Sequence, residues 1–248
     1  MGGTLIQARQ LLPALSAFDN RGKALDIRIG RGEIVALIGP DYCGKSDWLR
    51  TLVGVRPRAS GQLSLPAGKP DDFNAADWSA TRRQLAYVHS DNAILSAANA
   101  LQNVMLPAHY HRIARHATIR AEATQLLAEL GVYDLLSLPA ALRRDQRYRI
   151  AIARALILRP DALVLDNPFT ALDRAAAENF QQYLLRRVSQ HDMALLLVTH
   201  DIHFAIAHAD QIVFITGEAI QTFNRQRRIE HCEHAAVRHF LDRHRIPC

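Results

Sequence analysis

The sequence predicts an α/β fold in which a mixed, mostly parallel sheet is interrupted by a helical insertion. Short apolar runs typical of buried strands alternate with stretches of helical periodicity, which is the pattern of parallel strands joined by crossover helices. One long segment, residues 90–158, has helical periodicity alone. A glycine-rich loop of the form G-x-x-x-x-G-K-S directly follows one buried strand. These features predict a sheet core over residues 1–89 and 159–230, a helical subdomain over residues 90–158, and a carboxyl-terminal tail over residues 231–248.

The strands and helices of the first part are expected in the following order. A weak strand at residues 4–7 and a half-exposed strand at 24–29 precede the buried strand at 34–38. A helix follows Ser46 and ends at residues 57–61, and a strand is expected at 84–88.

The rest of the chain continues this alternation after the helical segment. The apolar residues of that segment share one helical face, namely Ile119, Ala123, Leu126, Leu127 and Leu130, and Gly131 is the expected C-cap. Next come a strand at 162–165, a helix at 174–188 with Asp173 as its N-cap, a strand at 195–198, and a hairpin of 212–215 with 220–223.

The composition is that of an ordinary globular protein, with 248 residues of which 49% are hydrophobic and 22% charged. The apolar runs fall well short of the ~20 residues that span a bilayer, and the first residues lack the features of a secretory signal. The three cysteines, an odd number, favour a reducing cytosol. We therefore expect a cytoplasmic protein.

The chain is basic, with a formal net charge of +6 and a pI near 9.6. Such a charge is compatible with nucleic acid or an anionic membrane surface as a partner. The arginines are scattered, however, and no aromatic residues are interleaved with them as base stacking would require. A solvated basic face is the favoured interpretation, and no nucleic-acid partner is expected.

The glycine-rich loop predicts a nucleotide triphosphate site. Backbone N–H groups and the positive end of the following helix can hold phosphates, Lys45 can reach the terminal ones, and the Ser46 hydroxyl can bind Mg²⁺. The expected nucleotide contacts are Gly39, Pro40, Asp41, Tyr42, Cys43, Gly44, Lys45, Ser46 and Asp47.

Further landmarks follow the loop in order, at residues 146–156, 163–168, 170–173 and 198–201. In this order and spacing they resemble the helix after the signature, the Walker B strand, the D-loop and the switch histidine of the ATP-binding subunits of ABC transporters. The resemblance covers about residues 20–225. It implies a P-loop NTPase fold with a RecA-like mixed-sheet core and an inserted α-helical subdomain, ATP and Mg²⁺ as cofactors, and transmembrane permease subunits and a second ATPase subunit, identical or different, as partners.

The resemblance also assigns roles to individual residues. Asp166, at the end of an apolar strand, corresponds to the carboxylate that holds Mg²⁺. His200 corresponds to the switch histidine that hydrogen-bonds the γ-phosphate. Phe18 corresponds to the aromatic residue that stacks on adenine, although packing in the core explains a phenylalanine there equally well.

Two departures from the family pattern concern hydrolysis. Asn167 stands where the family has its catalytic glutamate, and an amide can orient water but cannot accept its proton. Ser90 stands where the family has the glutamine that couples the site to the transport subunits, and its shorter side chain loses reach to metal and water. We therefore expect crippled hydrolysis at the chain's own loop.

The signature is altered as well. Arg143, Arg144, Asp145 and Gln146 occupy its end, so the serine and both glycines that approach the γ-phosphate of the opposing subunit are replaced. The favoured interpretation is a signature that no longer binds phosphate. The alternative is that Arg143 or Arg144 supplies charge to the phosphate, since guanidinium matches phosphate oxygens.

Substitutions in the loop bear on nucleotide affinity. Tyr42 replaces a usual glycine and Asp47 a usual threonine, and the carboxylates of Asp41 and Asp47 are expected to repel phosphates and reduce the affinity. Cys43 is either a reactive thiol, if exposed, or an inert buried one, which is the preferred interpretation.

Histidine clusters at residues 109–111 and 231–234 have side chains that could bind Zn²⁺, and surface histidines are the favoured interpretation. The segment at residues 236–242 resembles the end of the ATPases that serve MCE-type lipid-trafficking systems.

The leading functional hypothesis is an ATP-binding subunit on the cytoplasmic face of the inner membrane that binds Mg-nucleotide with little hydrolysis and serves lipid transport. One alternative is an active ATPase in which Asn167 deamidates, or Asp173 or Asp201 acts as the base. Another is a nucleic-acid-associated ATPase of the same fold, supported only by the basic pI.

Overall fold

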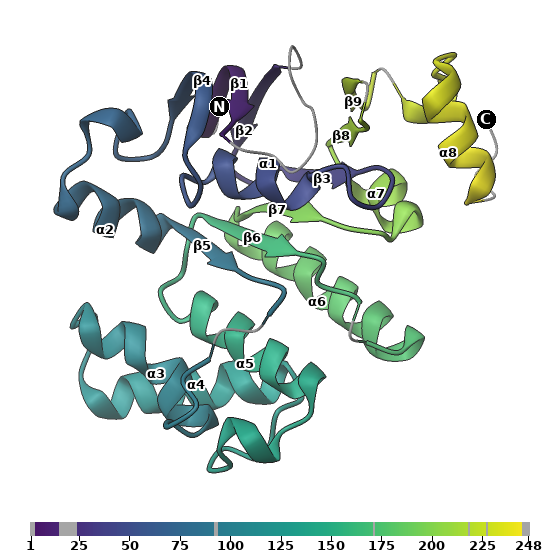
Figure 1. Cartoon of the computed structure of the whole chain (residues 1–248). Coiled ribbons are helices and arrows are strands. Elements are labelled where there is room, and N and C mark those ends of the chain that lie inside the picture. Colours follow the sequence, from purple (N-terminus) through teal and green to yellow (C-terminus); the bar gives the residue numbers. More distant parts are fainter. Residues whose placement is uncertain are drawn as a thin grey trace.

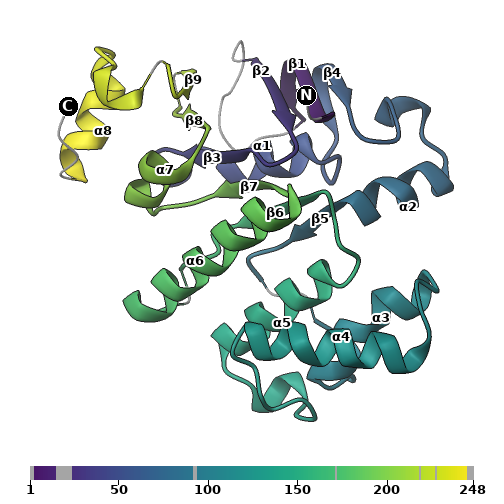
Figure 2. The ribbon, with the colours of Figure 1, turned by 180° about the vertical axis from the view of Figure 1, so that it is seen from behind.

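The computed structural model describes residues 3–14, 24–91, 94–170, 172–217, 219–226 and 228–244. Two sheets lie on either side of one helix, and a cluster of three helices is attached below the larger sheet (Figures 1 and 2). Among the described residues, no helix combines the length and apolar character needed to cross a membrane.

The first part of the chain and the helical segment contain, in chain order, β1 (Thr4–Pro13), β2 (Leu25–Gly30), β3 (Ile34–Ile38), α1 (Lys45–Leu52), β4 (Arg58–Ser64), a 3₁₀ turn (Pro70–Asp72), α2 (Ala75–Gln84), β5 (Leu85–Val88), α3 (Ala100–Tyr110), α4 (His116–Glu129), a 3₁₀ turn (Pro139–Ala141) and α5 (Arg144–Leu156).

The last part of the chain returns to the larger sheet and ends in a helix. Its elements are β6 (Ala162–Asp166), α6 (Arg174–His191), β7 (Ala194–Val198), α7 (Ile202–His208), β8 (Gln211–Ile215), β9 (Ile220–Asn224), a 3₁₀ turn (Ile229–His231) and α8 (Ala235–Arg243).

The larger sheet has six strands in the order β5-β6-β7-β3-β8-β9. All neighbouring pairs are parallel except β8 and β9, which form an antiparallel hairpin. The predicted α/β fold with a mixed, mostly parallel sheet is therefore confirmed. Because the strands run the same way, the carboxyl ends of β5, β6, β7, β3 and β8 meet at one edge, which is where ligands bind in such sheets.

The central strands are apolar because both of their faces are covered. All residues of β3, β6 and β7 are buried, as expected for strands between helical layers. The alternation of side chains divides β3 between two cores: Ala36 and Ile38 pack with the helices below the sheet, whereas Val35 and Leu37 pack with α1 above it.

Helix α1 is held between the two sheets. The smaller sheet is antiparallel, in the order β2-β1-β4, and its buried residues share one core with Trp48 and Leu49 of α1. Both of these α1 side chains are fully buried. The helix that follows the glycine-rich loop is thus fixed from both sides.

The three helices of the middle segment pack on one another and on the lower face of the sheet (Figure 1). Helix α4 carries the predicted apolar face, and it ends before Gly131, whose φ of +71° is the left-handed conformation typical of a helix end. We propose that residues 90–158 form the inserted helical subdomain, because α3, α4 and α5 all lie within these limits.

Most predicted strands match the structure to within one or two residues, and Asp173 caps α6 as expected through a 2.8 Å bond from the backbone N–H of Ala176. Strand β4 and helices α2, α7 and α8 were not predicted from the sequence. Strand β4 is largely exposed, and α2 buries only one residue, so neither shows a strong hydrophobic period. The capping box of Asn74 and Asp77 was a usable signal for α2.

Gly39 joins β3 to the loop in a conformation that requires glycine. Its φ is +144°, and a Cβ atom there would lie 2.0 Å from the carbonyl oxygen of Ile215 at the end of β8. We predict that Gly39→Ala lowers the free energy of unfolding by about 2–4 kcal/mol, measured by urea denaturation. Gly217→Ala is the control, because a Cβ at Gly217 meets nothing within 4 Å. Equal stability of the two variants would contradict this account.

Candidate functional site

The loop between β3 and α1 lies at the carboxyl edge of the sheet, and Lys45 is the cation at its centre. This side chain is 6% exposed. Its ammonium donates to the carbonyl oxygens of Gly39 at 2.8 Å and Pro40 at 2.5 Å. Both acceptors are neutral, so the loop holds a buried positive charge to which phosphate oxygens are suited.

The side chain of Tyr42 points away from the loop and does not occupy the space that phosphates would take. Its φ is +62°, the left-handed region that explains why glycine suits this position. The residue is 83% exposed, so its side chain extends into solvent. Asp41 is also exposed and lies 3.4 Å from His200.

Asp47 does not add an uncompensated negative charge to the site. Its carboxylate accepts a hydrogen bond from Arg56 and lies 3.7 Å from the guanidinium of Arg50. Both partners neutralise it on the flank of α1. These contacts argue against the expected repulsion of phosphates by Asp47, and the sequence pattern did not reveal the two arginines as its partners.

Cys43 is buried in the loop, as the preferred interpretation of a buried thiol expects. Its Sγ atom lies 3.0 Å from the carbonyl oxygens of Pro40 and Ile215. Burial raises the pKa of the Cys43 thiol, although the charge of Lys45 acts in the opposite direction. The reactive-thiol alternative is excluded by this burial.

Asp166 is the buried carboxylate of the site, at the end of β6 and 1% exposed. The Ser46 hydroxyl donates to its Oδ1 at 2.7 Å. Asn167, with φ of +52°, places its Nδ2 3.4 Å from the same oxygen. The side-chain Oδ1 of Asn167 is buried, and among the described residues it has no hydrogen-bond partner.

These oxygens fit Mg²⁺. Carboxylate, hydroxyl and amide oxygens are the ligands that this hard cation accepts in proteins, usually with phosphates and waters completing its shell. The unpartnered oxygen of Asn167 indicates an additional polar group in this place. Ser46 and Asp166 are the residues that would hold the ion, and the ion would supply charge neutralisation between phosphate oxygens.

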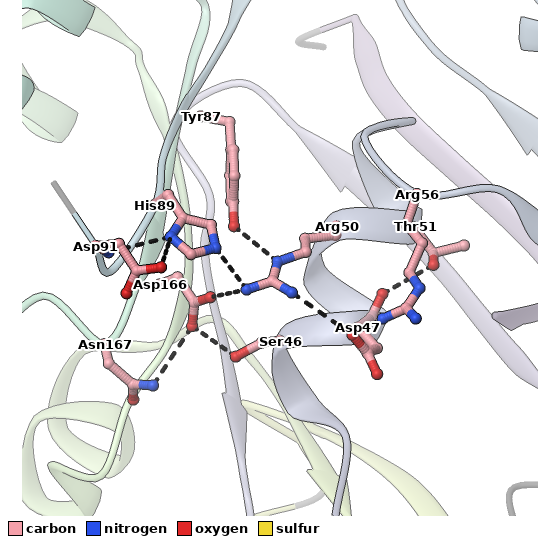
Figure 3. Close-up of polar contacts among 10 residues, drawn as sticks. All are labelled: Ser46, Asp47, Arg50, Thr51, Arg56, Tyr87, His89, Asp91, Asp166 and Asn167. Carbon is pink, nitrogen blue, oxygen red and sulfur yellow. Dashed lines mark hydrogen bonds and ion pairs between the residues drawn. The ribbon is translucent and has the colours of Figure 1, made fainter. Parts of the chain in front are cut away.

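Arg50 forms a network beside Asp166 that was not predicted from the sequence (Figure 3). Its guanidinium donates to the Tyr87 hydroxyl at 3.1 Å, contacts His89 Nε2 at 2.7 Å, and lies 3.4 Å from Asp166 Oδ2. Burial alone would lower the pKa of Arg50, but the bond to Tyr87 and the charge of Asp166 raise it. Its position on the same face of α1 as Ser46, four residues earlier, was the one available signal.

His200 follows β7 and lies beside the loop, where the resemblance places it. Burial lowers the pKa of its imidazole, and the charge of Lys45 lowers it further while Asp41 raises it. A neutral imidazole at pH 7 can donate one hydrogen bond to a phosphate oxygen. A cavity of about 560 Å³ joins the loop residues and His200 to α8, with His239 and Arg243 in its lining. The predicted tail thus reaches the edge of the site.

The altered signature lies at the start of α5. Arg143 holds Asp145 through two contacts of 3.1 and 3.3 Å, and the Gln146 side chain accepts from the Arg143 backbone N–H at 3.0 Å. Arg144 is exposed beside them. These contacts stabilise the first turn of the helix.

Ser90 and Phe18 complete the predicted set. Ser90 is half-buried two residues beyond the end of β5, next to the His89 that contacts Arg50. Phe18 lies outside the described residues. Among the described histidines, cysteines and carboxylates, no group of three or more is arranged to hold a metal ion.

Comparison with protein families gives a match to the family model described as ABC transporter, over residues 23–170. This is more than half of the chain. Domains of this family bind ATP with Mg²⁺, which confirms the predicted cofactors, and they act as dimers beside transmembrane permease subunits.

Curated relatives include the aliphatic sulfonates import ATP-binding protein SsuB 1 of Xanthomonas axonopodis pv. citri, which is 33% identical over 78% of this chain and 74% of the relative. The sulfate/thiosulfate import ATP-binding protein CysA of Bordetella bronchiseptica is 34% identical over 90% of this chain and 63% of the relative. The chain thus spans less than two thirds of the second relative.

Solved structures share the fold. A dimeric ATP-binding cassette in a post-hydrolysis state, bound to ADP and Pi, superposes with a TM-score of 0.80 at 23% identity, over 89% of this chain and 98% of that chain. The expected P-loop NTPase fold with a RecA-like core and helical insertion is confirmed. The family match, the identity to the curated relatives and the loop geometry agree, and the chain belongs to the ATP-binding domains of ABC transporters.

Proposed function

We propose that this chain is the ATP-binding subunit of an ABC transporter that captures Mg-ATP and hydrolyses it slowly. The observation that carries the proposal is the amide of Asn167 beside the buried Asp166. A carboxylate at that place could accept a proton from the attacking water, whereas an amide cannot. The remaining groups, Lys45, Ser46 and Asp166, suffice for binding.

The backbone of Asn167 is attached to the neighbouring strand, which supports an amide held beside Asp166. Its backbone N–H donates to the carbonyl oxygen of Val198 at 3.0 Å, so it is attached to the end of β7. Asparagine is among the residues that best tolerate its left-handed conformation. A glutamate there would be strained by about 1 kcal/mol.

The two carboxylates considered as substitute bases have structural tasks. Asp173 accepts from the backbone N–H of Ala176 at 2.8 Å as the cap of α6. Asp201 caps α7 and also accepts from Gln181 at 2.7 Å. Both carboxylates are thus engaged in holding helix ends, and these contacts favour slow hydrolysis over the active alternative.

The altered signature supports an impaired composite site. In the family each nucleotide lies between the loop of one subunit and the signature of the other, so a second ATPase subunit is a proposed partner. Arg143 already forms a paired contact with Asp145. A guanidinium engaged in this way is less available to a phosphate across the dimer, which favours a signature that no longer binds phosphate.

The proposed location is the cytoplasmic face of the inner membrane, reached through transmembrane permease subunits. The transported substrate depends on these partners rather than on the ATPase fold. The names of these relatives concern import of sulfonates and of sulfate or thiosulfate, and neither name supports lipid transport. We therefore favour import of a small oxyanion, and lipid transport stays a prediction that identification of the co-purified permease would test.

The first prediction concerns capture of nucleotide. Lys45→Ala should weaken ATP binding at least tenfold, since charge-assisted hydrogen bonds to phosphate contribute about 1.5–3 kcal/mol. Isothermal titration calorimetry measures the affinity, and a thermal melt verifies that the variant folds. Lys69→Ala is the matched control, because Lys69 is exposed away from the loop. Equal affinity of the Lys45→Ala and Lys69→Ala variants would refute the site.

The second prediction concerns hydrolysis. Asn167→Glu should raise steady-state phosphate release about tenfold. This is less than the ~10²–10⁴-fold typical of a general base, because the signature remains altered. Asn167→Gln is the control, since glutamine has the same side-chain length as glutamate and the same backbone strain at this position, but lacks a basic oxygen. If both variants released phosphate at the same rate, the missing carboxylate would not explain slow turnover.

A further inference from the structure

We propose that Arg50 is a positioning residue that couples the Mg²⁺-binding carboxylate of Asp166 to the end of β5. The inference rests on the proposed Mg-ATP site and adds to it a built-in cation that shares the carboxylate with the metal. Figure 3 shows the Arg50 guanidinium beside Asp166, Tyr87 and His89.

The first half of the coupling is the contact with the metal carboxylate. Arg50 Nη2 lies 3.4 Å from Asp166 Oδ2, while the other oxygen of Asp166 accepts from Ser46. The Asp166 side chain is 1% exposed and that of Arg50 is 26% exposed. The pair is therefore poorly screened by water, and the guanidinium offsets the charge of Asp166.

The charge of the site makes this contact important. Asn167 is neutral, so Asp166 is the carboxylate at the end of β6, and Arg50 lies against it. With Mg²⁺ bound, Asp166 would have a stronger cationic partner, so the Arg50 guanidinium would contribute less to offsetting its charge. When Mg²⁺ is removed, Arg50 limits the repulsion between Asp166 and the nucleotide phosphates.

The second half of the coupling is the contact with β5. Arg50 Nε donates to the Tyr87 hydroxyl at 3.1 Å, and Nη2 donates to His89 Nε2 at 2.7 Å. Because a guanidinium can only donate, His89 Nε2 is the acceptor of this bond. On the other side of the ring, Nδ1 accepts from the Asp91 backbone N–H at 3.0 Å and lies 3.3 Å from the Asp91 carboxylate. The contacts thus continue from Asp166 to Asp91, at the start of the segment that leads to α3.

The fork shape of arginine explains why one residue can serve both ends. Its donors are held in one plane, so Tyr87 on β5, His89 directly after that strand, and Asp166 at the end of β6 are contacted together. A shift of the guanidinium toward or away from Asp166 therefore changes its bonds to β5. Binding of Mg²⁺ at Asp166 would therefore alter the hydrogen bonds that Arg50 makes to Tyr87 and His89, and with them the conformation of residues 87–91.

The test measures ATP affinity of the full chain by isothermal titration calorimetry, once in excess Mg²⁺ and once in EDTA. The dissociation constant in EDTA divided by that in Mg²⁺ should be about fivefold larger in Arg50→Met than in the wild type, because the uncompensated Asp166 repels phosphates when Mg²⁺ is absent. Arg50→Lys keeps the charge and should restore most of the wild-type ratio. Arg225→Met is the control: it breaks an ion pair with Asp210, which precedes β8 and so lies at the opposite edge of the sheet from the loop, and it should leave the ratio unchanged.

A second readout tests the β5 half without nucleotide. Hydrogen exchange of the peptide covering residues 85–91 should become about threefold faster in Arg50→Met, since bonds to Tyr87 and His89 are lost. Arg50→Lys should also exchange faster, because an ammonium lacks the fork that reaches both side chains. Arg225→Met should exchange like the wild type, because its partner Asp210 lies at the far side of the sheet from β5.

The outcomes separate this proposal from the proposed function. An unchanged Mg²⁺ ratio in Arg50→Met, or an equal change in Arg225→Met, would overturn the link to Asp166. Unchanged exchange in Arg50→Met would overturn the link to β5. Failure of the wild-type chain to bind ATP in either condition would overturn the Mg-ATP site itself, and with it the Asp166 half of the coupling.

Discussion

The parallel pairing of β3 with β7 and β8 is the constraint on which the rest of the structure depends. It brings the ends of these strands to one edge. There Gly39 lies against the Ile215 carbonyl, and the backbone N–H of Asn167 donates to the carbonyl oxygen of Val198. The loop can hold phosphates only because α1 is fixed between two sheets, so that Lys45 and Ser46 have defined positions. Local glycine chemistry and long-range packing therefore act together.

The electrostatics of the site follow from this arrangement. A buried ammonium, Lys45, meets neutral carbonyls, and a buried carboxylate, Asp166, meets a hydroxyl, an amide and a guanidinium. In the proposed function Lys45, Ser46 and Asp166 bind the metal nucleotide, while the group that would take a proton from water is replaced by Asn167. Binding and turnover are thus separable in this chain on chemical grounds, and Arg50 supplies a cation that moderates the carboxylate.

Much of the fold and part of the site could be predicted from residues alone. The buried strands, the loop with Lys45 and Ser46, and Asp166 at a strand end depend on short-range patterns that a single sequence contains. The partners of Asp47 and the network of Arg50 could not be predicted, because arginines on α1 and side chains at the end of β5 meet only in the folded sheet. The apolar residues Val237, Phe240 and Leu241 were a helical signal for α8, but its place beside His200 is a tertiary feature.

The central claim is that ATP is captured and retained rather than rapidly cleaved. A single-turnover experiment on the purified chain, alone and with co-purified permease and ATPase subunits, measures it most directly by following the conversion of bound radiolabelled ATP to ADP and phosphate. The account predicts bound ATP that is cleaved well below ~1 s⁻¹, the low end of ordinary enzymes. Cleavage at or above that rate by the wild-type chain, lost when Lys45 is replaced, would contradict it.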